Sequence, residues 1–271
     1  MTDYPTLTLN DDRQIPQIGF GTWKLEGDEA TDSVKAALEA GYWLIDTAEI
    51  YGNEEQVGEA IGEWSDIFLQ TKIWNDDQGY ERTQEAAREA LERLGREHVD
   101  MLLIHWPCPE KGKTLETWKA LIQLREDGLA KSIGVSNFRE EDLRMIVEET
   151  GVTPALNQIE LHPSFQQREL RKVHADMGIV TQCWSPLGQG ETMDDDALQS
   201  VAQEVGAPVS TVVLAWHMNH GLAPIPRSTN PEHIADNLRA REITLTDEQV
   251  AKIDALDSAD GRMGEHPDEV N

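Results

Sequence analysis

Short runs of apolar, β-prone residues alternate along the chain with segments whose apolar residues recur at helical spacing. The repeat at i, i+3, i+4 and i+7 is clearest at Ala87, Ala90, Leu91 and Leu94. Glycines that end the helical segments stand shortly before the next apolar run: Gly41, Gly95, Gly128, Gly151, Gly178 and Gly221. The eight predicted strands cover residues 17–20, 42–45, 67–71, 101–104, 131–135, 156–159, 179–183 and 222–225.

Eight strands that alternate with about eight helices predict an α/β protein with a (β/α)8 barrel, the TIM barrel. A doubly wound parallel sheet is the main competitor. The segment Gly19-Phe20-Gly21-Thr22-Trp23-Lys24 lacks the third glycine of the dinucleotide-binding fingerprint, and no helix-opening pattern follows it. The barrel is therefore favoured.

Three further elements are expected outside the strand–helix repeat. Residues 6–9 and 14–15, around Asn10-Asp11-Asp12, predict a β-hairpin ahead of the barrel that closes its bottom. Residues 195–205, before a helix at 209–220, and residues 247–256 predict two extra helices. No Pro/Gly/Ser linker divides the chain, so residues 1–271 are expected to form one domain.

The charge changes the picture of the surface. Fifty-one Asp and Glu against 23 Lys and Arg give a net charge of −28, and the acids are spread over the whole chain. Such a surface repels nucleic acid and anionic membranes. With only nine lysines among the basic residues, it suggests adaptation to concentrated salt, an ordinary acidic enzyme being the alternative.

The lack of targeting signals and the small number of cysteines argue against a membrane protein, a secreted protein and a disulfide-rich protein. No apolar run is long enough to cross a membrane, and the N-terminus shows no secretory signal, so a cytoplasmic protein is expected. Cys108 and Cys183, far apart in the sequence, predict neither a disulfide framework nor a metal site. We expect a monomer whose partner is a small molecule.

A polar or ionisable residue stands at the end of strand after strand, where chemistry gathers in such barrels. Each one alone has a plain alternative: Asp46 could cap a helix, Lys72 could be solvated and His105 could pack in the core. Their convergence at one barrel mouth is what carries the prediction. The residues are Gly21, Thr22, Trp23, Asp46, Lys72, His105, Ser136, Asn137, Gln158, Trp184, Ser185, Arg227 and Ser228.

If Asp46, Tyr51, Lys72 and His105 converge, they form a proton donor. A tyrosine titrates near 10, and a lysine ammonium ~4 Å away is expected to lower that pKa by up to about 3 units. Asp46 would hold the lysine charged, and His105 could hydrogen-bond a carbonyl oxygen. This is the acid half of carbonyl reduction. The other half is a hydride, which requires a nicotinamide cofactor.

Ordered motifs across the chain resemble those of the aldo-keto reductases. They are residues 41–48 (Gly-Tyr-Trp-Leu-Ile-Asp-Thr-Ala), 51–54 (Tyr-Gly-Asn-Glu), 71–74 (Thr-Lys-Ile-Trp), 103–107 (Leu-Ile-His-Trp-Pro), 133–138 (Ile-Gly-Val-Ser-Asn-Phe), 157–163 (Asn-Gln-Ile-Glu-Leu-His-Pro), 185–188 (Ser-Pro-Leu-Gly) and 225–229 (Ile-Pro-Arg-Ser-Thr). The resemblance implies that Tyr51 is the general acid, Lys72 and Asp46 its tuning pair and His105 the substrate-orienting residue. Short loops after His105 and Trp184 resemble the microbial type, particularly the 2,5-diketo-D-gluconate reductases.

The resemblance also implies a dinucleotide site for NADPH. Ser136, Asn137 and Gln158 match the residues that bind the nicotinamide carboxamide, and Trp184 matches an aromatic residue stacked on the nicotinamide ring. The full cofactor set is Gly21, Thr22, Trp23, Asp46, Ser136, Asn137, Gln158, Trp184, Ser185, Leu187, Gly188, Arg227, Ser228, Thr229, His233, Asp236 and Asn237.

Two positions depart from the family pattern. Arg227 replaces a lysine at the adenosine 2′-phosphate and offers a bidentate contact. His233 stands where an arginine is common, so NADH is expected to retain some activity. Trp23, Trp74 and Trp106, with His105, match the substrate pocket, although the tryptophans could instead pack in the core. Four other tryptophans are assigned to packing: Trp43, Trp64, Trp118 and Trp216.

The favoured function is NADPH-dependent reduction of an aldehyde or ketone, with a keto-sugar acid such as 2,5-diketo-D-gluconate as one candidate. A non-catalytic NADP(H)-binding sensing or interaction subunit on the same fold is the alternative. A Schiff-base aldolase using Lys72 is a third hypothesis, disfavoured because pairing with Asp46 keeps the lysine protonated.

Overall fold

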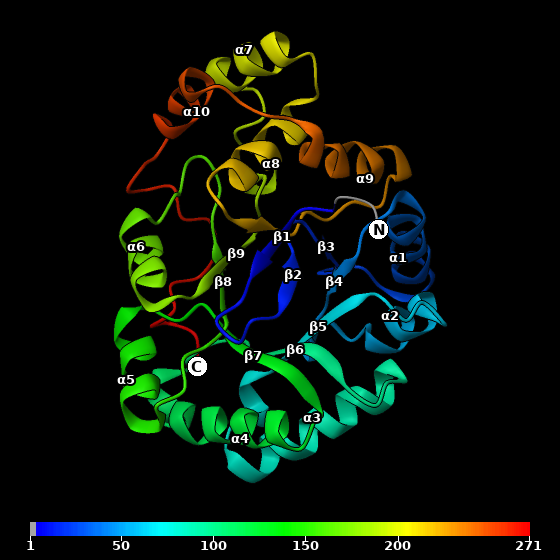
Figure 1. Ribbon diagram of the computed structural model, residues 1–271, viewed down its shortest axis with the longest axis vertical. Helices are drawn as coiled ribbons and strands as arrows, with labels where there is room; N and C mark the ends of the chain where they lie inside the picture. Colours follow the sequence, from blue (N-terminus) through cyan, green and yellow to red (C-terminus); the bar gives the residue numbers. More distant parts are fainter. Residues whose placement is uncertain (1–3) are drawn as a thin grey trace.

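Eight parallel strands form one curled sheet in the computed structural model, which describes residues 4–271 (Figure 1). The strands follow one another in chain order across the sheet, as the alternating pattern predicts. Their bounds are β3 Phe20–Gly21, β4 Leu44–Asp46, β5 Phe68–Ile73, β6 Val99–Ile104, β7 Ala130–Ser136, β8 Leu156–Glu160, β9 Val180–Trp184 and β10 Ala223–Pro224.

The first and last strands of the sheet approach each other. The backbone nitrogen of Gly19 donates to the oxygen of Pro224 at 3.1 Å, and that of Gly21 donates to the oxygen of Pro226 at 3.0 Å. A Cβ at Gly21 would lie 3.1 Å from the Ile225 oxygen, a tight contact, so this close approach favours glycine. The arrangement is consistent with the predicted (β/α)8 architecture.

Helices surround the sheet, and each strand is followed by at least one of them (Figure 1). The α-helices are α1 Gly27–Ala40, α2 Glu54–Ile61, α3 Tyr80–Leu94, α4 Thr114–Glu126, α5 Glu140–Thr150, α6 Arg168–Met177, α7 Asp196–Val205, α8 Val209–Asn219, α9 Pro231–Leu238 and α10 Asp247–Asp254. Short 3-10 turns are η1 Glu49–Tyr51, η2 Asn75–Asp77, η3 Pro109–Lys111, η4 Gly188–Gly190 and η5 Arg239–Glu242. The two extra helices are confirmed as α7 and α10, which pack against each other.

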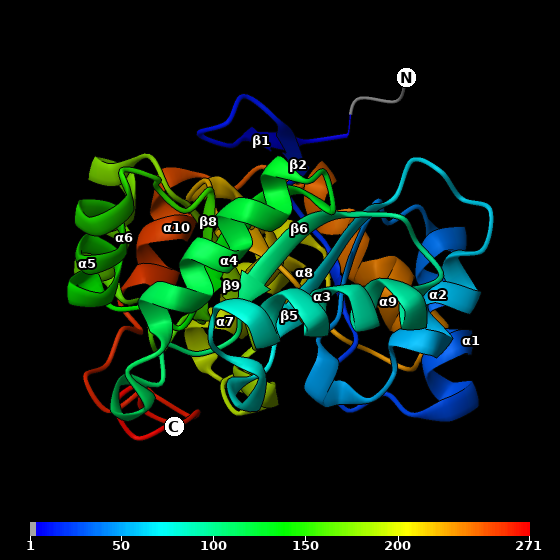
Figure 2. The ribbon, with the colours of Figure 1, turned by 90° about the horizontal axis from the view of Figure 1, so that it is seen from below.

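The predicted hairpin is present as β1 Thr6–Thr8 and β2 Gln14–Pro16, which pair antiparallel. Leu9 and Ile15 from this hairpin are buried against interior side chains of the sheet, among them Met101 and Leu156. Figure 2 shows the hairpin at one end of the molecule and the C-terminal segment at the other. The hairpin therefore closes the end opposite the carboxyl ends of the strands.

The assignment of four tryptophans to packing is half right. Trp118 and Trp216 are fully buried. Trp43 and Trp64, however, are 37% and 54% exposed, so that prediction is wrong for them. Trp43 lies just before β4 and stacks on Tyr4 outside the sheet, and Trp64 lies in the loop that joins α2 to β5. An apolar ring at a strand's start or in a loop has no fixed face toward the core.

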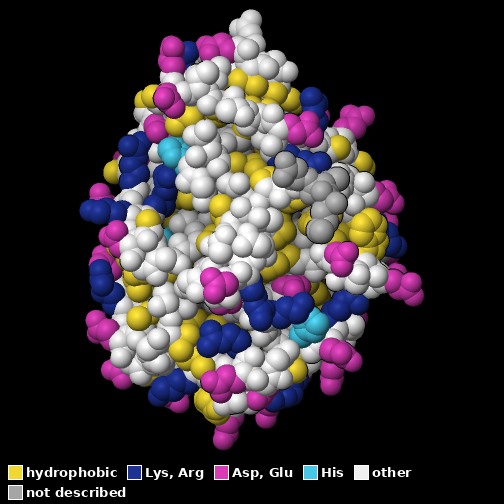
Figure 3. Space-filling model, in the orientation of Figure 1, with side chains coloured by type: hydrophobic (Ala, Val, Ile, Leu, Met, Phe, Trp, Pro, Cys, Tyr) yellow, Lys and Arg dark blue, Asp and Glu magenta, His cyan; other side chains and the backbone are white. Residues whose placement is uncertain are grey.

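Acidic side chains are dispersed over the hairpin end of the molecule and alternate with basic ones around its rim (Figure 3). They form no single acidic patch on this face. Among residues 4–271, no helix is long and apolar enough to cross a membrane.

Candidate active site

A cavity of about 1230 Å³ opens at the carboxyl ends of the strands. Side chains from β4, β7, β8 and β9 and from the loops that follow the strands line it. Three of the four predicted catalytic residues are on its wall: Asp46, Tyr51 and His105. The fourth, Lys72, lies behind the wall and is 1% exposed.

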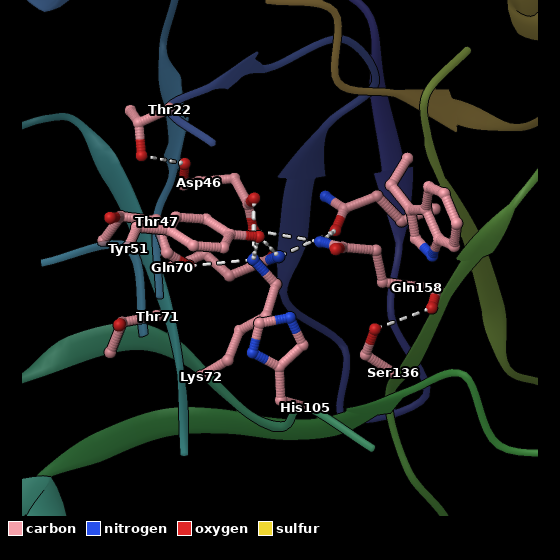
Figure 4. Close-up of polar contacts among 12 residues, drawn as sticks. Thr22, Asp46, Thr47, Tyr51, Gln70, Thr71, Lys72, His105, Ser136 and Gln158 are labelled. Carbon is pink, nitrogen blue, oxygen red and sulfur yellow. Dashed lines mark hydrogen bonds and ion pairs between the residues drawn. The ribbon is translucent and has the colours of Figure 1, made fainter. Parts of the chain in front are cut away.

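Lys72 is the hub of this group (Figure 4). Its Nζ lies 2.8 Å from Oδ2 of Asp46, 2.8 Å from the backbone oxygen of Thr47 and 3.4 Å from Oη of Tyr51. The ammonium therefore donates all three of its hydrogens. The alternatives of a helix-capping Asp46 and a solvated Lys72 are excluded by these contacts.

Local structure brings Tyr51 to the lysine. Asp46 ends β4, and η1 turns the chain so that Tyr51 faces back toward it, with Gly52 in the left-handed region at φ 64°. Asn53 fixes this turn from below, since its side chain accepts from Thr47 and donates to the backbone oxygens of Thr22 and Leu25. Within the motif 51–54, Gly52 and Asn53 therefore hold the loop that carries Tyr51.

The electrostatics differ in one respect from expectation. Burial raises the pKa of Tyr51 above 10, Lys72 lowers it only in part, and Asp46 raises it again. The expected net lowering is therefore wrong, because burial outweighs the effect of the lysine charge and Asp46 offsets part of that charge. Burial lowers the pKa of Lys72, but Asp46 and Tyr51 raise it above its usual value, so the lysine is a cation.

His105 follows β6 directly and is 8% exposed. Burial, and then the charge of Lys72, lower its pKa well below the usual value, so the ring is neutral at physiological pH. The ring packs edge-on against Tyr51 and Trp74, with centroids 5.8 and 5.1 Å apart. Its Nδ1 has no hydrogen-bond partner within residues 4–271. A neutral imidazole beside a tyrosine can donate a hydrogen bond to a carbonyl oxygen between them.

Most residues of the predicted cofactor set line the same cavity: Gly21, Trp23, Asp46, Ser136, Asn137, Gln158, Trp184, Ser185, Leu187, Arg227, Ser228, His233, Asp236 and Asn237. Three do not. Thr22 is buried and donates to the backbone oxygen of Asp46, Gly188 packs near His162, and Thr229 is exposed outside the wall. The four predicted substrate residues, Trp23, Trp74, His105 and Trp106, are all on the wall.

The donors and acceptors on the wall fit a dinucleotide. The indole Nε1 of Trp184 donates to Oδ1 of Asn137 at 2.8 Å, which fixes the ring at the cavity. Asn237 is 4% exposed, and its Oδ1 has no partner among the described residues. Arg227 is exposed and forms no ion pair with any residue from 4 to 271, so its guanidinium is available to a phosphate.

Sequence reasoning missed part of the wall. Ile50, Gln189, Met193 and residues 208–210 line the cavity, as do Met263, Gly264, Glu265 and Val270 of the C-terminal segment. That segment contains no helix or strand and has no apolar period that could place it. Ile50 is 48% exposed, and its position next to Tyr51 is the sequence signal that could have placed it at the cavity.

The fold and the site define a protein whose parallel strands place a tyrosine in contact with a buried lysine at the wall of a large cavity. Residues 17–258 match the Aldo/keto reductase family. An aldo-keto reductase of Mycobacterium sp. (strain JLS) is 44% identical over 98% of both chains. The glyoxal reductase of Bacillus subtilis (strain 168) is 42% identical over 98% of this chain and 97% of its own.

Solved structures agree. The crystal structure of Gox0644 in its apo form has a TM-score of 0.97 and 43% identity over 99% of both chains, and a variant of Gox0644 was solved with NADPH. An aldo-keto reductase of Bombyx mori, solved with NADP, has a TM-score of 0.88 and 35% identity over 95% of this chain and 94% of its own. The chain belongs to the aldo-keto reductase family. It is an oxidoreductase that acts on carbonyl groups.

Proposed function

We propose that this protein reduces an aldehyde or ketone to the alcohol with NADPH, and that Tyr51 supplies the proton. The observation that carries the proposal is the contact set of Lys72, which joins Asp46 to Tyr51 at distances of 2.8 and 3.4 Å. A reductase needs a proton donor whose conjugate base is stabilised, and a buried cation beside the phenol oxygen does this.

In the proposed reaction His105 and Tyr51 hydrogen-bond the carbonyl oxygen of the substrate. The nicotinamide, when bound, supplies the hydride to the carbonyl carbon. As the oxygen becomes negative, Tyr51 transfers its proton to that oxygen, and Lys72 stabilises the phenolate that remains. Asp46 holds the lysine in place throughout. Trp23, Trp74 and Trp106 exclude water from the reacting carbonyl.

The cofactor proposed is NADP(H), which the Gox0644 variant and the Bombyx mori relative bind in their structures. Ser136, Asn137 and Gln158 would hold the nicotinamide amide and Trp184 would stack on its ring. Arg227, with Ser228 and Thr229, would contact the 2′-phosphate. His233, Asp236 and Asn237 would surround the adenosine. Because His233 brings less charge than an arginine, NADH would keep measurable activity.

The physiological substrate proposed is a small aldehyde or ketone, with a keto-sugar acid such as 2,5-diketo-D-gluconate as one candidate. The relative named glyoxal reductase supports small dicarbonyls as a class.

We also propose that the curled sheet is a closed (β/α)8 barrel and that residues 1–271 form one domain. We further propose a monomeric, cytoplasmic and salt-adapted protein, the last because of its net charge of −28.

Two other hypotheses are less well supported. A Schiff-base aldolase needs a lysine that is free to attack a carbonyl carbon, whereas all three hydrogens of Lys72 are donated. A non-catalytic NADP(H)-binding subunit has no need of a proton donor at the wall of its cavity.

The test is NADPH oxidation by the purified protein with aldehydes, diketones and keto-sugar acids in high potassium chloride. Tyr51→Phe removes only the transferable proton, so kcat should fall by at least ~10², the usual scale for loss of a general acid. NADPH binding, followed by its fluorescence, should hardly change. Turnover at the wild-type rate in that variant would remove Tyr51 from the mechanism, and no turnover of any carbonyl by the wild type would favour the binding subunit.

A further inference from the structure

Three glutamine side chains occupy the interior of the sheet directly beneath the candidate active site. Gln70 comes from β5, Gln158 from β8 and Gln182 from β9, and their exposed fractions are 0, 2 and 0%. Branched apolar residues usually fill such an interior. Only Gln158 reaches the cavity wall. The other two face only the interior and have no part in the proposed binding of substrate or cofactor.

Both amide nitrogens that face Asp46 are fully used. Nε2 of Gln70 donates to Oδ1 of Asp46 at 2.6 Å, and Nε2 of Gln158 donates to the same oxygen at 2.9 Å. Each nitrogen also donates to Oε1 of Gln182 at 2.7 Å. Figure 4 shows Gln70 and Gln158 approaching Asp46 from different strands. The two amides and two acceptors form a closed ring of four hydrogen bonds.

The carboxylate sets the direction of every bond in this ring. An ionised aspartate only accepts, so Gln70 and Gln158 must turn their NH2 groups toward it. Their second hydrogens then require an oxygen from Gln182 on the other side. With Oδ1 held by two amides, Oδ2 is left to accept from Lys72. The ring therefore fixes which oxygen of Asp46 meets the lysine.

The ring is poorly explained by stability alone. Oε1 of Gln70 and Nε2 of Gln182 are buried and have no hydrogen-bond partner within residues 4–271. Unpaired buried polar atoms destabilise a fold, and apolar side chains of the same size would avoid the loss. Polar groups that are kept at such a cost to stability, next to a predicted catalytic carboxylate, point to a role in the site.

We propose that Gln70 and Gln182 are positioning residues of the proton-donating group: they hold the Asp46 carboxylate in the orientation that aims Lys72 at Tyr51. Gln70 acts on Asp46 directly. Gln182 acts indirectly, because its Oε1 accepts hydrogen bonds from the side-chain amides of Gln70 and Gln158. Gln158 is also one of the residues proposed to bind the nicotinamide, so Gln182 links that residue to Gln70. The inference rests on the proposed function of the site, and it adds two residues to it.

The first experiment compares Gln70→Met with Gln17→Met. Methionine keeps the length of the side chain but removes both amide donors. Gln17 is also buried, and it donates to the backbone oxygens of Met218 and Leu222 at the hairpin end, far from the site. Both variants lose buried hydrogen bonds and should lose similar stability. Only Gln70→Met should lower kcat, by about tenfold or more, with little change in the KM for NADPH.

The pH profile separates positioning from mere structure. With Lys72 less well aimed, the phenolate of Tyr51 is less stabilised, so the alkaline limb of the reduction profile should move to higher pH in Gln70→Met but not in Gln17→Met. Gln182→Met, which leaves the contacts to Asp46 in place, should shift the limb in the same direction by less. The inference is overturned if Gln70→Met and Gln182→Met both keep the wild-type profile and match Gln17→Met in kcat.

A crystal structure of Gln70→Met tests the inference even if the wild type reduces no carbonyl, an outcome that would refute the proposed function instead. The carboxylate of Asp46 should rotate, and the 3.4 Å contact between Lys72 and Tyr51 should change by more than about 0.5 Å, the tolerance of a working site. If Gln70→Met does not fold, the structure of Gln182→Met serves the same purpose. Unchanged positions of Asp46 and Lys72 would overturn the inference.

Discussion

Replacing Gly264 should loosen the C-terminal segment from the cavity it covers. Glu160, at the end of β8, is 1% exposed, and its two oxygens accept from the backbone nitrogens of Met263 at 2.7 Å and Gly264 at 3.1 Å. Burial raises the pKa of this carboxyl, but hydrogen bonds from His162 and from the two backbone nitrogens lower it below its usual value, so it is ionised. One buried carboxylate thus ties the segment to the sheet.

Gly264→Ala removes this tie by steric conflict. An added Cβ would overlap the ring edge of Trp184 and lie 3.0 Å from Oε2 of Glu160, and both neighbours are held in place. The segment must move outward and lose at least one hydrogen bond to a charged acceptor, which contributes about 1.5–3 kcal/mol. That energy corresponds to roughly 10- to 150-fold in an equilibrium constant. Because Met263, Gly264, Glu265 and Val270 line the cavity, the KM for the carbonyl substrate should rise by about tenfold or more, and kcat should change less.

The assay is steady-state reduction at saturating NADPH, with thermal unfolding as a check on the fold. Glu269→Ala is the matched control, since Glu269 lies in the same segment, is exposed and does not line the cavity. The reasoning is refuted if Gly264→Ala keeps the KM of the control. It is also refuted if kcat falls while KM stays, because that result would place the segment in the chemical step rather than in substrate binding.

Two further predictions concern charged groups. Arg227→Ala should lower the ratio of kcat/KM for NADPH over that for NADH by roughly 10- to 150-fold, the scale of a charge-assisted contact, and an unmoved ratio would show that Arg227 does not bind the phosphate. Glu49, two residues before Tyr51, has its pKa raised to about 7, first by burial and also by Asp77. Folding raises the pKa of this carboxyl from 4.5 to about 7, so its ionisation is disfavoured in the folded state and the Tm should fall as pH rises from about 4.5 to about 7. Glu49→Gln should flatten this dependence, and a wild-type Tm that rises over the same interval would contradict it.

The sequence predicted the elements and the mouth of the site because both depend on short-range patterns. Each predicted strand overlaps an observed one, and their bounds differ by at most three residues. The residue that ends a parallel strand must also lie at the edge that all the strands share. Asp46 and His105 could be placed at the cavity for this reason alone. Lys72 was assigned to the same edge, but it lies within β5 and beneath the wall, where the pleat turns it inward toward Asp46.

What the sequence could not supply depends on contacts between distant segments. Gln70 and Gln182 stand in ordinary strand positions 112 residues apart, and only the sheet order brings their side chains into contact beside Asp46. The C-terminal segment has no pattern of its own, and its place is set by Glu160, more than a hundred positions earlier. The prediction that the pKa of Tyr51 would be lowered failed for a related reason. The pKa depends on the balance between burial, Lys72 and Asp46, and that balance follows from how deeply each group is buried, which the sequence does not show.

The acidic surface and the proposed anionic cofactor oppose each other, and salt should decide the outcome. At 0.01 M salt the Debye length is ~30 Å, so the carboxylates that give the net charge of −28 repel one another and also repel NADPH. At 1 M salt the Debye length is ~3 Å, and both repulsions are screened. The same salt weakens the local attraction of Arg227, but one exposed cation is outweighed by many dispersed carboxylates. Both the Tm and kcat/KM for NADPH should therefore rise from dilute buffer to molar potassium chloride. A Tm that stays flat or falls over that range would refute salt adaptation, and a rising Tm with a falling kcat/KM would show that the local charge of Arg227 governs the encounter.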